Sequence, residues 1–245
     1  MRKHLPNSLT CLNLISGCTA TYFAFQSNAK MALMWIIVGA VFDFFDGMAA
    51  RLLGVSSPIG KELDSLADDI TFGMAPAAIV FSELAAIDYP SFMEPARPYL
   101  PFAAFLIAAF SALRLAKFNI DTRQATSFIG MPTPANALFW GSFVVGQSEW
   151  IENNRFALYA ILVLILATCW LLVSEIPMFS LKFKHLRWKD NNIKLYFSFF
   201  SVVMLIVFGW IDAWWLIISV YVLTSIVINT VNKRQGTGTI NTQAT

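Results

Sequence analysis

Six of the fifteen acidic residues lie between positions 41 and 70, in a stretch otherwise rich in apolar side chains. Asp43 and Asp46 are three residues apart, and Asp64 and Asp68 are four apart, so each pair would share one face of a helix. Two helices that bring such pairs to one point form an oxygen-lined pocket suited to a hard divalent cation. Because carboxylates in apolar surroundings are costly unless neutralised, this spacing indicates a metal site.

Small and basic residues flank these acids. Gly47 and Ala50 leave one helix face bare, and Gly60 offers another surface that a ligand can approach closely. Arg51 adds a guanidinium that matches phosphate geometry. Together with a cation, these residues describe a site for a pyrophosphate-bearing ligand. The alternative is a solvated loop with acids facing the cytosol, but Phe42 and other large apolar residues alternate with the acids and argue against it.

The composition is that of an integral membrane protein. Hydrophobic residues make up 57% of the chain and charged residues 13%, with a mean hydropathy of +0.62. Soluble domains usually carry about 25% charged residues. Apolar runs long enough to cross a lipid bilayer predict eight spans, at residues 9–26, 31–51, 63–85, 100–118, 135–148, 156–176, 194–210 and 213–232.

The basic residues predict the orientation of these spans. Of the seventeen Lys and Arg residues, all but Lys30, Arg97 and Arg155 fall on one side of the predicted membrane. Basic loops are retained in the cytoplasm, so we expect both termini and the acidic cluster to face the cytoplasm.

The three cysteines, Cys11, Cys18 and Cys169, all lie in apolar runs without metal-ligand spacing. We interpret them as buried thiols rather than as a disulfide framework or a redox motif.

The central stretch resembles a known family signature. The pattern D-x2-D-G-x2-A-R-x8-G-x3-D-x3-D, which runs from Asp43 to Asp68 with no position missing, is similar to that of the CDP-alcohol phosphatidyltransferases. The resemblance implies a membrane enzyme that displaces CMP from a CDP-linked lipid or alcohol with the help of Mg²⁺ or Mn²⁺. It implies that the four Asp of the pattern bind the metal and that Asp68 also acts as general base. The residues implied in holding the nucleotide are Gly47, Ala50, Arg51 and Gly60, with Asn7 and Thr10.

Further segments resemble the bacterial and archaeal phosphatidylserine synthase branch of this family. They are DSLADDITFGMAPA (64–77), RLAKFN (114–119), FIGMPTPANA (128–137) and LLVSEIPMFSLKFK (171–184). With PNSLT near the N-terminus, the resemblance covers residues 6–184. It implies CDP-diacylglycerol and L-serine as substrates. Two residues depart from the pattern of that branch: Lys117 stands where Arg is commoner, and Asp69 where a neutral residue is commoner.

The fold class expected from these observations is an all-α polytopic membrane protein. We expect a six-helix catalytic core at residues 1–184, a basic cytoplasmic loop with two extra membrane helices at 185–232, and a disordered tail at 233–245. The resemblance implies a homodimer in the cell membrane, and we expect no nucleic-acid partner.

Some interpretations remain open. Arg114 and Lys117 would hold the carboxylate of the acceptor or the lipid phosphate, or serve only as interfacial anchors. Gly73 and Pro76 would loosen the third helix, either as a packing kink or to shape an acceptor pocket. Glycerol 3-phosphate or inositol phosphate is an alternative acceptor. A non-enzymatic cation transporter would explain the acids, but it gives no reason for the fixed offsets of Gly47, Ala50, Arg51 and Gly60.

Overall fold

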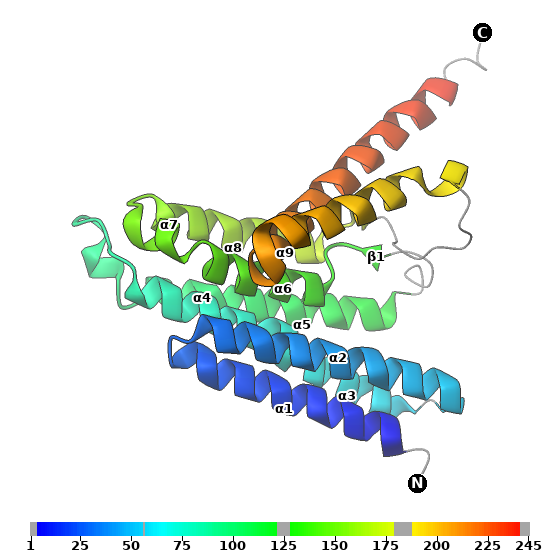
Figure 1. Cartoon of the computed structure of the whole chain (residues 1–245), viewed down its shortest axis with the longest axis horizontal. Helices are drawn as coiled ribbons and strands as arrows, with labels where there is room; N and C mark the ends of the chain where they lie inside the picture. Colours follow the sequence, from blue (N-terminus) through cyan, green and yellow to red (C-terminus); the bar gives the residue numbers. More distant parts are fainter. Residues whose placement is uncertain (1–3, 56, 122–127, 179–187, 241–245) are drawn as a thin grey trace.

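The computed structural model describes residues 4–55, 57–121, 128–178 and 188–240, and these are almost entirely helical. The first two helices, α1 (Leu5–Phe25) and α2 (Ala29–Leu53), form an antiparallel pair (Figure 1). The Asn28 side chain accepts a hydrogen bond from the Met31 amide and so caps the start of α2. Helix α2 ends at Gly54, whose φ of 61° favours glycine.

The next helix is continuous but changes its winding. It consists of α3 (Pro58–Asp68), the π-helical segment η2 (Asp69–Met74) and α4 (Ala75–Ala86). The Ser57 side chain caps its start, and Pro58 occupies the first turn, where no amide donor is needed. The loosening predicted at Gly73 and Pro76 therefore takes the form of a π-helix that ends just before Pro76. Such segments are frequent at functional sites.

The remaining elements complete the helical body and add one short strand pair. The helices are η3 (Glu94–Ala96), η4 (Leu100–Ala104), α5 (Phe105–Ile120), α6 (Thr133–Gly146), α7 (Ser148–Asn153), α8 (Ala157–Val173) and α9 (Trp188–Ile240). The strands β1 (Phe128–Ile129) and β2 (Pro177–Met178) pair antiparallel, a small addition to the predicted all-α fold.

Helix α9 reverses direction within its length, as Figure 1 shows where the ribbon turns from yellow through orange to red. Gly209 has a φ of 80°. Apolar helical stretches lie on either side of it, at Phe197–Val207 and Ile211–Val231. Two helical arms therefore stand where the sequence predicts the spans 194–210 and 213–232.

Four helices in the described part of the chain are long and apolar enough to cross a membrane: Ala29–Leu53, Pro58–Ala86, Leu100–Ile120 and Ile211–Val231. They match four of the eight predicted spans. Each of the other four predicted spans also corresponds to a helix, namely α1, α6, α8 and the first arm of α9. The protein is thus a helical membrane protein, and the count of eight spans stays a prediction.

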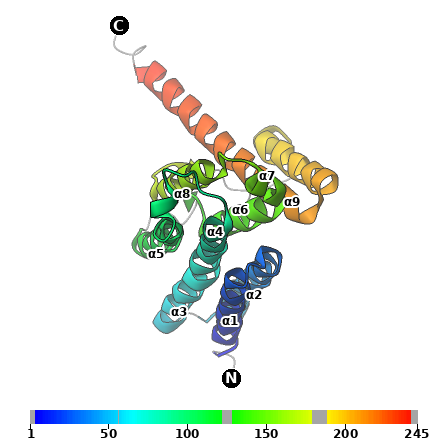
Figure 2. The same cartoon turned by 90° about the vertical axis from the view of Figure 1, so that its left-hand side faces the viewer.

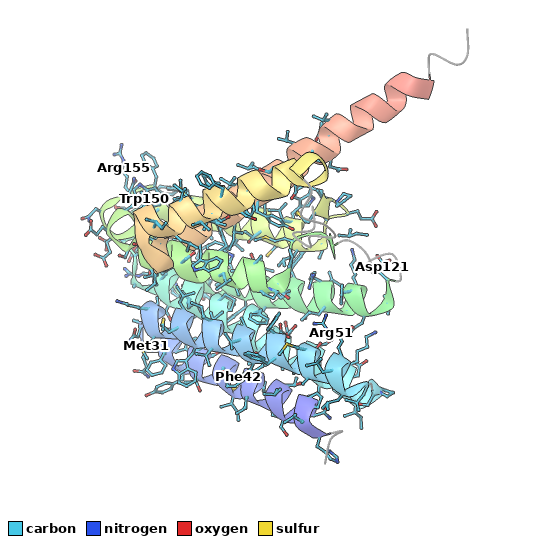
Figure 3. All side chains as sticks on the ribbon, turned by 45° about the vertical axis from the view of Figure 1, so that its right-hand side comes forward. Met31, Phe42, Arg51, Asp121, Trp150 and Arg155 are labelled. Atoms are coloured by element: carbon cyan, nitrogen blue, oxygen red, sulfur yellow. The ribbon has the colours of Figure 1, made fainter. Side chains whose placement is uncertain are left out.

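The ends of the helices gather at two opposite ends of the molecule. Both termini lie at one end of the molecule, and the α1–α2 turn and α7 lie at the other (Figure 1). Figure 3 shows Arg51 and Asp121 at the end with the termini, and Met31, Trp150 and Arg155 at the opposite end. The side of the membrane on which each end lies stays a prediction.

Close backbone contact brings α1 and α2 against η2. A Cβ atom on Gly17 would collide with Thr71, and one on Gly39 would lie 2.5 Å from Thr71 Cγ2. Seen along the helices in Figure 2, the α3–α4 helix stands between the α1–α2 pair and α5. In membranes, helices associate through such small residues because lipid gives little hydrophobic driving force.

The prediction of buried thiols is wrong for two of the three cysteines. Cys169 is buried, but Cys11 and Cys18 are exposed. They lie on the face of α1 that is not used for packing, where an apolar side chain would face lipid. An apolar run in a membrane protein does not distinguish these two environments.

Candidate active site

Three carboxylates from two helices converge. One oxygen from each of Asp43 on α2 and Asp64 and Asp68 on α3 lies within 4.8 Å of the other two. All three side chains are partly buried. Among the described residues no Lys or Arg forms an ion pair with them, since the one ion pair found there joins Arg97 and Glu94. Three unpaired carboxylates at this spacing repel each other, and their oxygens are the ligands that Mg²⁺ and Mn²⁺ prefer, so they fit a divalent cation.

Asp46, the fourth predicted metal ligand, is placed differently. It is only 6% exposed and does not belong to the group of three. Its Oδ2 accepts a hydrogen bond of 2.6 Å from the Thr10 hydroxyl on α1. Asp46 and Asp64 both line the cavity described below, so Asp46 lies beside the carboxylate group.

A hydrogen-bond relay holds Asp68. The Asn13 side-chain amide on α1 donates to Asp68 Oδ1 over 3.0 Å, and Asn13 is fully buried. The Thr71 hydroxyl in η2 donates to the Asn13 carbonyl over 3.0 Å. Asp68 is therefore oriented from α1, a helix far away in the sequence. Asn13 and Thr71 could not be identified from the sequence, because no local spacing links them to the acidic pattern.

A cavity of about 500 Å³ opens beside the carboxylates. Five of the six residues expected to hold a nucleotide line it: Asn7, Thr10, Gly47, Ala50 and Gly60. The sixth, Arg51, is exposed and is not among the lining residues, and its Nε donates to the Gly47 carbonyl over 3.0 Å. The remaining lining residues are Pro6, Asp46, Gly54, Val55, Ser57, Lys61 and Asp64.

One point of the cavity wall, at Gly60, leaves little room for a side chain. A Cβ atom on Gly60 would lie 3.0 Å from Ser57 Oγ and 3.2 Å from Asn7 Oδ1, so a larger residue would narrow the space between α1 and α3. Next to it Lys61, which the sequence analysis did not select, lines the cavity and donates to the Asn119 carbonyl over 2.8 Å. Lys61 thereby joins the start of α3 to the end of α5.

The two predicted acceptor residues lie around a second cavity, of about 310 Å³. Arg114 is 7% exposed, its Nη1 is 3.4 Å from the Thr133 hydroxyl, and its guanidinium stands 5.3 Å from the centre of the Phe118 ring. Lys117 donates to the Val173 carbonyl over 3.4 Å. Arg114 also interacts electrostatically with Asp68, so the second cavity borders the carboxylate group through this residue.

The carboxylate group is thus near both cavities: Asp64 lines the first, and Arg114, which interacts with Asp68, lines the second. The first has small residues and backbone on its wall, which suits a large ligand with phosphates. The second contains a nearly buried arginine, which suits a small anionic group. Asp68 accepts a hydrogen bond from Asn13 on α1, and Arg114 on α5 is near enough to interact with it electrostatically.

Comparisons with known proteins show the family of the chain. A family model described as CDP-alcohol phosphatidyltransferase matches residues 3–218. A CDP-diacylglycerol–serine O-phosphatidyltransferase from Helicobacter pylori is 32% identical over 202 residues, which cover 81% of this chain and 80% of that protein. Its namesake from Bacillus subtilis is 39% identical over 136 residues, 54% of this chain and 70% of that protein. A namesake from Mycobacterium leprae is 32% identical over 181 residues, 71% of this chain but 57% of that longer protein. The chain belongs to the CDP-alcohol phosphatidyltransferase family.

Proposed function

We propose that this protein transfers the phosphatidyl group from CDP-diacylglycerol to L-serine, giving phosphatidylserine and CMP. The observation that carries the proposal is the convergence of Asp43, Asp64 and Asp68 beside a cavity lined by Gly47, Ala50 and other small residues. The names of the similar proteins support serine as the acceptor.

The first cavity would hold the cytidine diphosphate portion of the donor. Gly47, Ala50 and Gly60 let the phosphates approach the backbone, and Asn7 and Thr10 supply polar groups from α1. Arg51 would need to turn from the Gly47 carbonyl to reach a phosphate. Asp43, Asp64 and Asp68 would hold Mg²⁺ or Mn²⁺, whose positive charge would offset the pyrophosphate and polarise the phosphorus–oxygen bond that breaks.

Asp68 would act as general base. The serine hydroxyl oxygen forms a bond to the phosphorus next to the lipid, its proton passes to Asp68, and the bond from that phosphorus to the CMP oxygen breaks. The amide of Asn13 fixes one carboxylate oxygen of Asp68, which restricts the rotation of the base. A catalytic group held in a fixed orientation lowers the activation barrier, so this hydrogen bond would raise the reaction rate.

The acceptor would enter through the second cavity. Arg114 offers a nearly buried guanidinium for the serine carboxylate, and Lys117 stands at the same wall. Asp121 and Glu175 line this cavity too, so its charges are mixed. A phosphate-bearing acceptor such as glycerol 3-phosphate or inositol phosphate would call for a denser basic pocket, which favours the zwitterionic amino acid.

The acyl chains would lie against helices that face lipid. Val41, Phe44 and Phe45 on α2 are exposed although they are apolar and adjoin Asp43 and Asp46. We assign the shared end of the helices that carries Arg51 to the cytoplasmic side of the cell membrane, because basic residues are retained there. A homodimer and a catalytic core at residues 1–184 belong to the same proposal.

The decisive experiment measures CMP release by the purified protein with CDP-diacylglycerol and a panel of acceptors: L-serine, glycerol 3-phosphate and inositol phosphate. We expect release only with serine and only with a divalent cation. Asp43→Asn and Asp64→Asn should abolish release while leaving folding and membrane insertion intact, with Glu62→Gln on the same helix as control, since Glu62 is exposed. Release that survives complete chelation would refute the metal site, and binding of cation without binding of cytidine nucleotides would favour a transporter.

A further inference from the structure

Lys61 brings a positive charge into the wall of the first cavity. Among the described residues it is the only Lys or Arg in that wall, where it stands with the acids Asp46 and Asp64. Arg51, which was expected to meet a phosphate, lies outside the wall and donates to the Gly47 carbonyl. Two linked phosphates carry negative charge along their whole length, whereas the carboxylate group offers a cation site only beside Asp64. Lys61 can therefore supply positive charge to the rest of the cavity.

The position of Lys61 on α3 indicates which phosphate it would meet. Lys61 and Asp64 are three residues apart and share a face of the helix, with Lys61 about 4.5 Å nearer its start. Asp68 lies a further turn along, so the acceptor hydroxyl and the phosphorus that it attacks belong to that side. The cavity continues in the opposite direction, because Ser57 and Gly60 also line it. The cytidine-linked phosphate would then lie on the side of Lys61.

The present contact of the Lys61 ammonium is easily exchanged. Its Nζ donates to the backbone carbonyl of Asn119 over 2.8 Å, and this hydrogen bond is exposed. The acceptor is neutral, and Lys61 forms no ion pair with any described residue. Hydrogen bonds to a charged oxygen are stronger than those to a neutral one. A phosphate in the cavity would therefore compete with the carbonyl for the ammonium, and water would replace the ammonium at the carbonyl.

The packing of α3 against α5 does not depend on this ammonium alone. The Asn119 side-chain amide donates to the Ser65 hydroxyl over 2.8 Å and joins the same two helices. This second hydrogen bond is partly buried and involves no charge. The helices therefore stay joined when Lys61 turns to a ligand. Removal of the Ser65 hydroxyl also weakens the junction without changing the charge of the cavity.

We propose that Lys61 binds the cytidine-linked phosphate of the donor and stabilises the charge that this phosphate gains when CMP leaves. The assignment rests on the proposed function. In the transfer, the bond between the lipid-linked phosphorus and the oxygen that bridges the two phosphorus atoms breaks. The electron pair of that bond stays on the bridging oxygen, so CMP leaves with one more negative charge, while the serine proton passes to Asp68. A positive group held where negative charge develops lowers the activation barrier.

The test measures CMP binding by isothermal titration calorimetry, with the purified protein in detergent and saturating Mg²⁺. Lys61→Met keeps a long side chain at this exposed position but removes the charge. We expect the Kd for CMP to rise about tenfold, as for one charge-assisted hydrogen bond in a cavity open to water. Lys61→Arg keeps the charge and should restore most of the affinity. Ser65→Ala and Glu62→Gln, an exposed neighbour, are the matched controls and should stay within about twofold of the unchanged protein.

Steady-state CMP release separates binding of the phosphate from packing. In Lys61→Met, turnover at saturating substrates should fall about tenfold, because the charge on the departing CMP is less stabilised. The KM for L-serine should not change. A purely structural Lys61 would instead loosen the end of α5, which carries Lys117 of the second cavity, and would raise the serine KM.

Three results would overturn the assignment: an unchanged Kd for CMP in Lys61→Met, an equal rise of this Kd in Ser65→Ala, or a loss of affinity that Lys61→Arg does not restore. If the unchanged protein bound no CMP in the presence of Mg²⁺, the proposed function itself would fail instead.

Discussion

Replacement of Thr10 by valine tests how the donor cavity is held together. The Thr10 hydroxyl is buried and lies 2.6 Å from Asp46 Oδ2 and 3.1 Å from the Pro6 carbonyl. It therefore donates its hydrogen bond to Asp46, which is the nearer acceptor and is charged. Valine has the same shape but no donor, which leaves a carboxylate at 6% exposure without this partner. Hydrogen bonds to charged groups contribute about 1.5–3 kcal/mol, so we expect the free energy of unfolding to fall by that amount.

The assay is thermal unfolding of the purified protein in detergent without divalent cation, followed by the fluorescence of its eight tryptophans. For a chain of this size the loss corresponds to a fall in Tm of roughly 3–12 °C. Thr10→Ser, which keeps the hydroxyl, is the matched control and should lose far less. Addition of Mg²⁺ should reduce the deficit of the valine variant if Asp46 binds the cation. Equal Tm values for Thr10→Val and Thr10→Ser would refute the reasoning, because the hydroxyl would then contribute nothing.

Three more predictions follow from the geometry. Asp68→Asn should lower turnover by about 10²- to 10⁴-fold, as for loss of a general base, with a much smaller change in the affinity for CDP-diacylglycerol at saturating Mg²⁺; equal losses in both would make Asp68 a ligand only. Gly39→Ala should lower the free energy of unfolding in detergent by about 1–3 kcal/mol, because the new methyl would lie 2.5 Å from Thr71 Cγ2. Adding Thr71→Ser to this variant should restore most of the loss, and an absence of rescue would contradict this contact. In a protein without its native cysteines, single cysteines at 2, 57, 121, 187 and 234 should react with a thiol reagent only from the cytoplasmic side, and those at 28, 92 and 152 only from the outside. External labelling at 187 would show that the span count is wrong.

The sequence predicted the parts of the site that local spacing encodes. Asp64 and Asp68 are four residues apart on one helix, and the structure brings one oxygen of each within 4.8 Å of Asp43 on the neighbouring helix. Gly60 and the other small residues were selected because they leave a surface bare, and they line the cavity as this interpretation requires. Short-range periodicity carries such information because a helix places residues three and four apart on one face.

Contacts between distant helices could not be predicted in the same way. Asn13 and Asp68 are 55 residues apart, and Lys61 and Asn119 are 58 apart. No pattern within one helix shows which polar residue of another helix will meet it. The hydrogen bonds of Asp46 and Arg51 could not be predicted either. Asp46 accepts from Thr10 on another helix, and Arg51 donates to the carbonyl of Gly47 on its own helix.

The fold was predictable to the level of helices but not of their winding. Apolar runs located the membrane helices because lipid imposes a length on them. Gly73 and Pro76 predicted an irregularity in the third span, yet nothing in their spacing specified a π-helix from Asp69 to Met74. Likewise the exposure of Cys11 and Cys18 depends on which face of α1 is packed, which apolar composition does not specify.

The π-helical segment also changes the register between the two halves of its helix. In a regular helix each residue advances the direction of the side chain by about 100°, so the orientation of Asp64 would dictate the orientation of every residue that follows. The wider turn at Asp69–Met74 interrupts this relation, and α4 beyond it is buried along most of its length while α3 keeps an exposed face. A π-helical turn holds about one residue more than an α-helical turn, so deletion of a single residue in this segment should give a regular helix and leave the buried face of α4 against the neighbouring helices. The wide turn therefore lets α3 direct Asp64 and Asp68 to the carboxylate group while α4 keeps its buried face against the neighbouring helices.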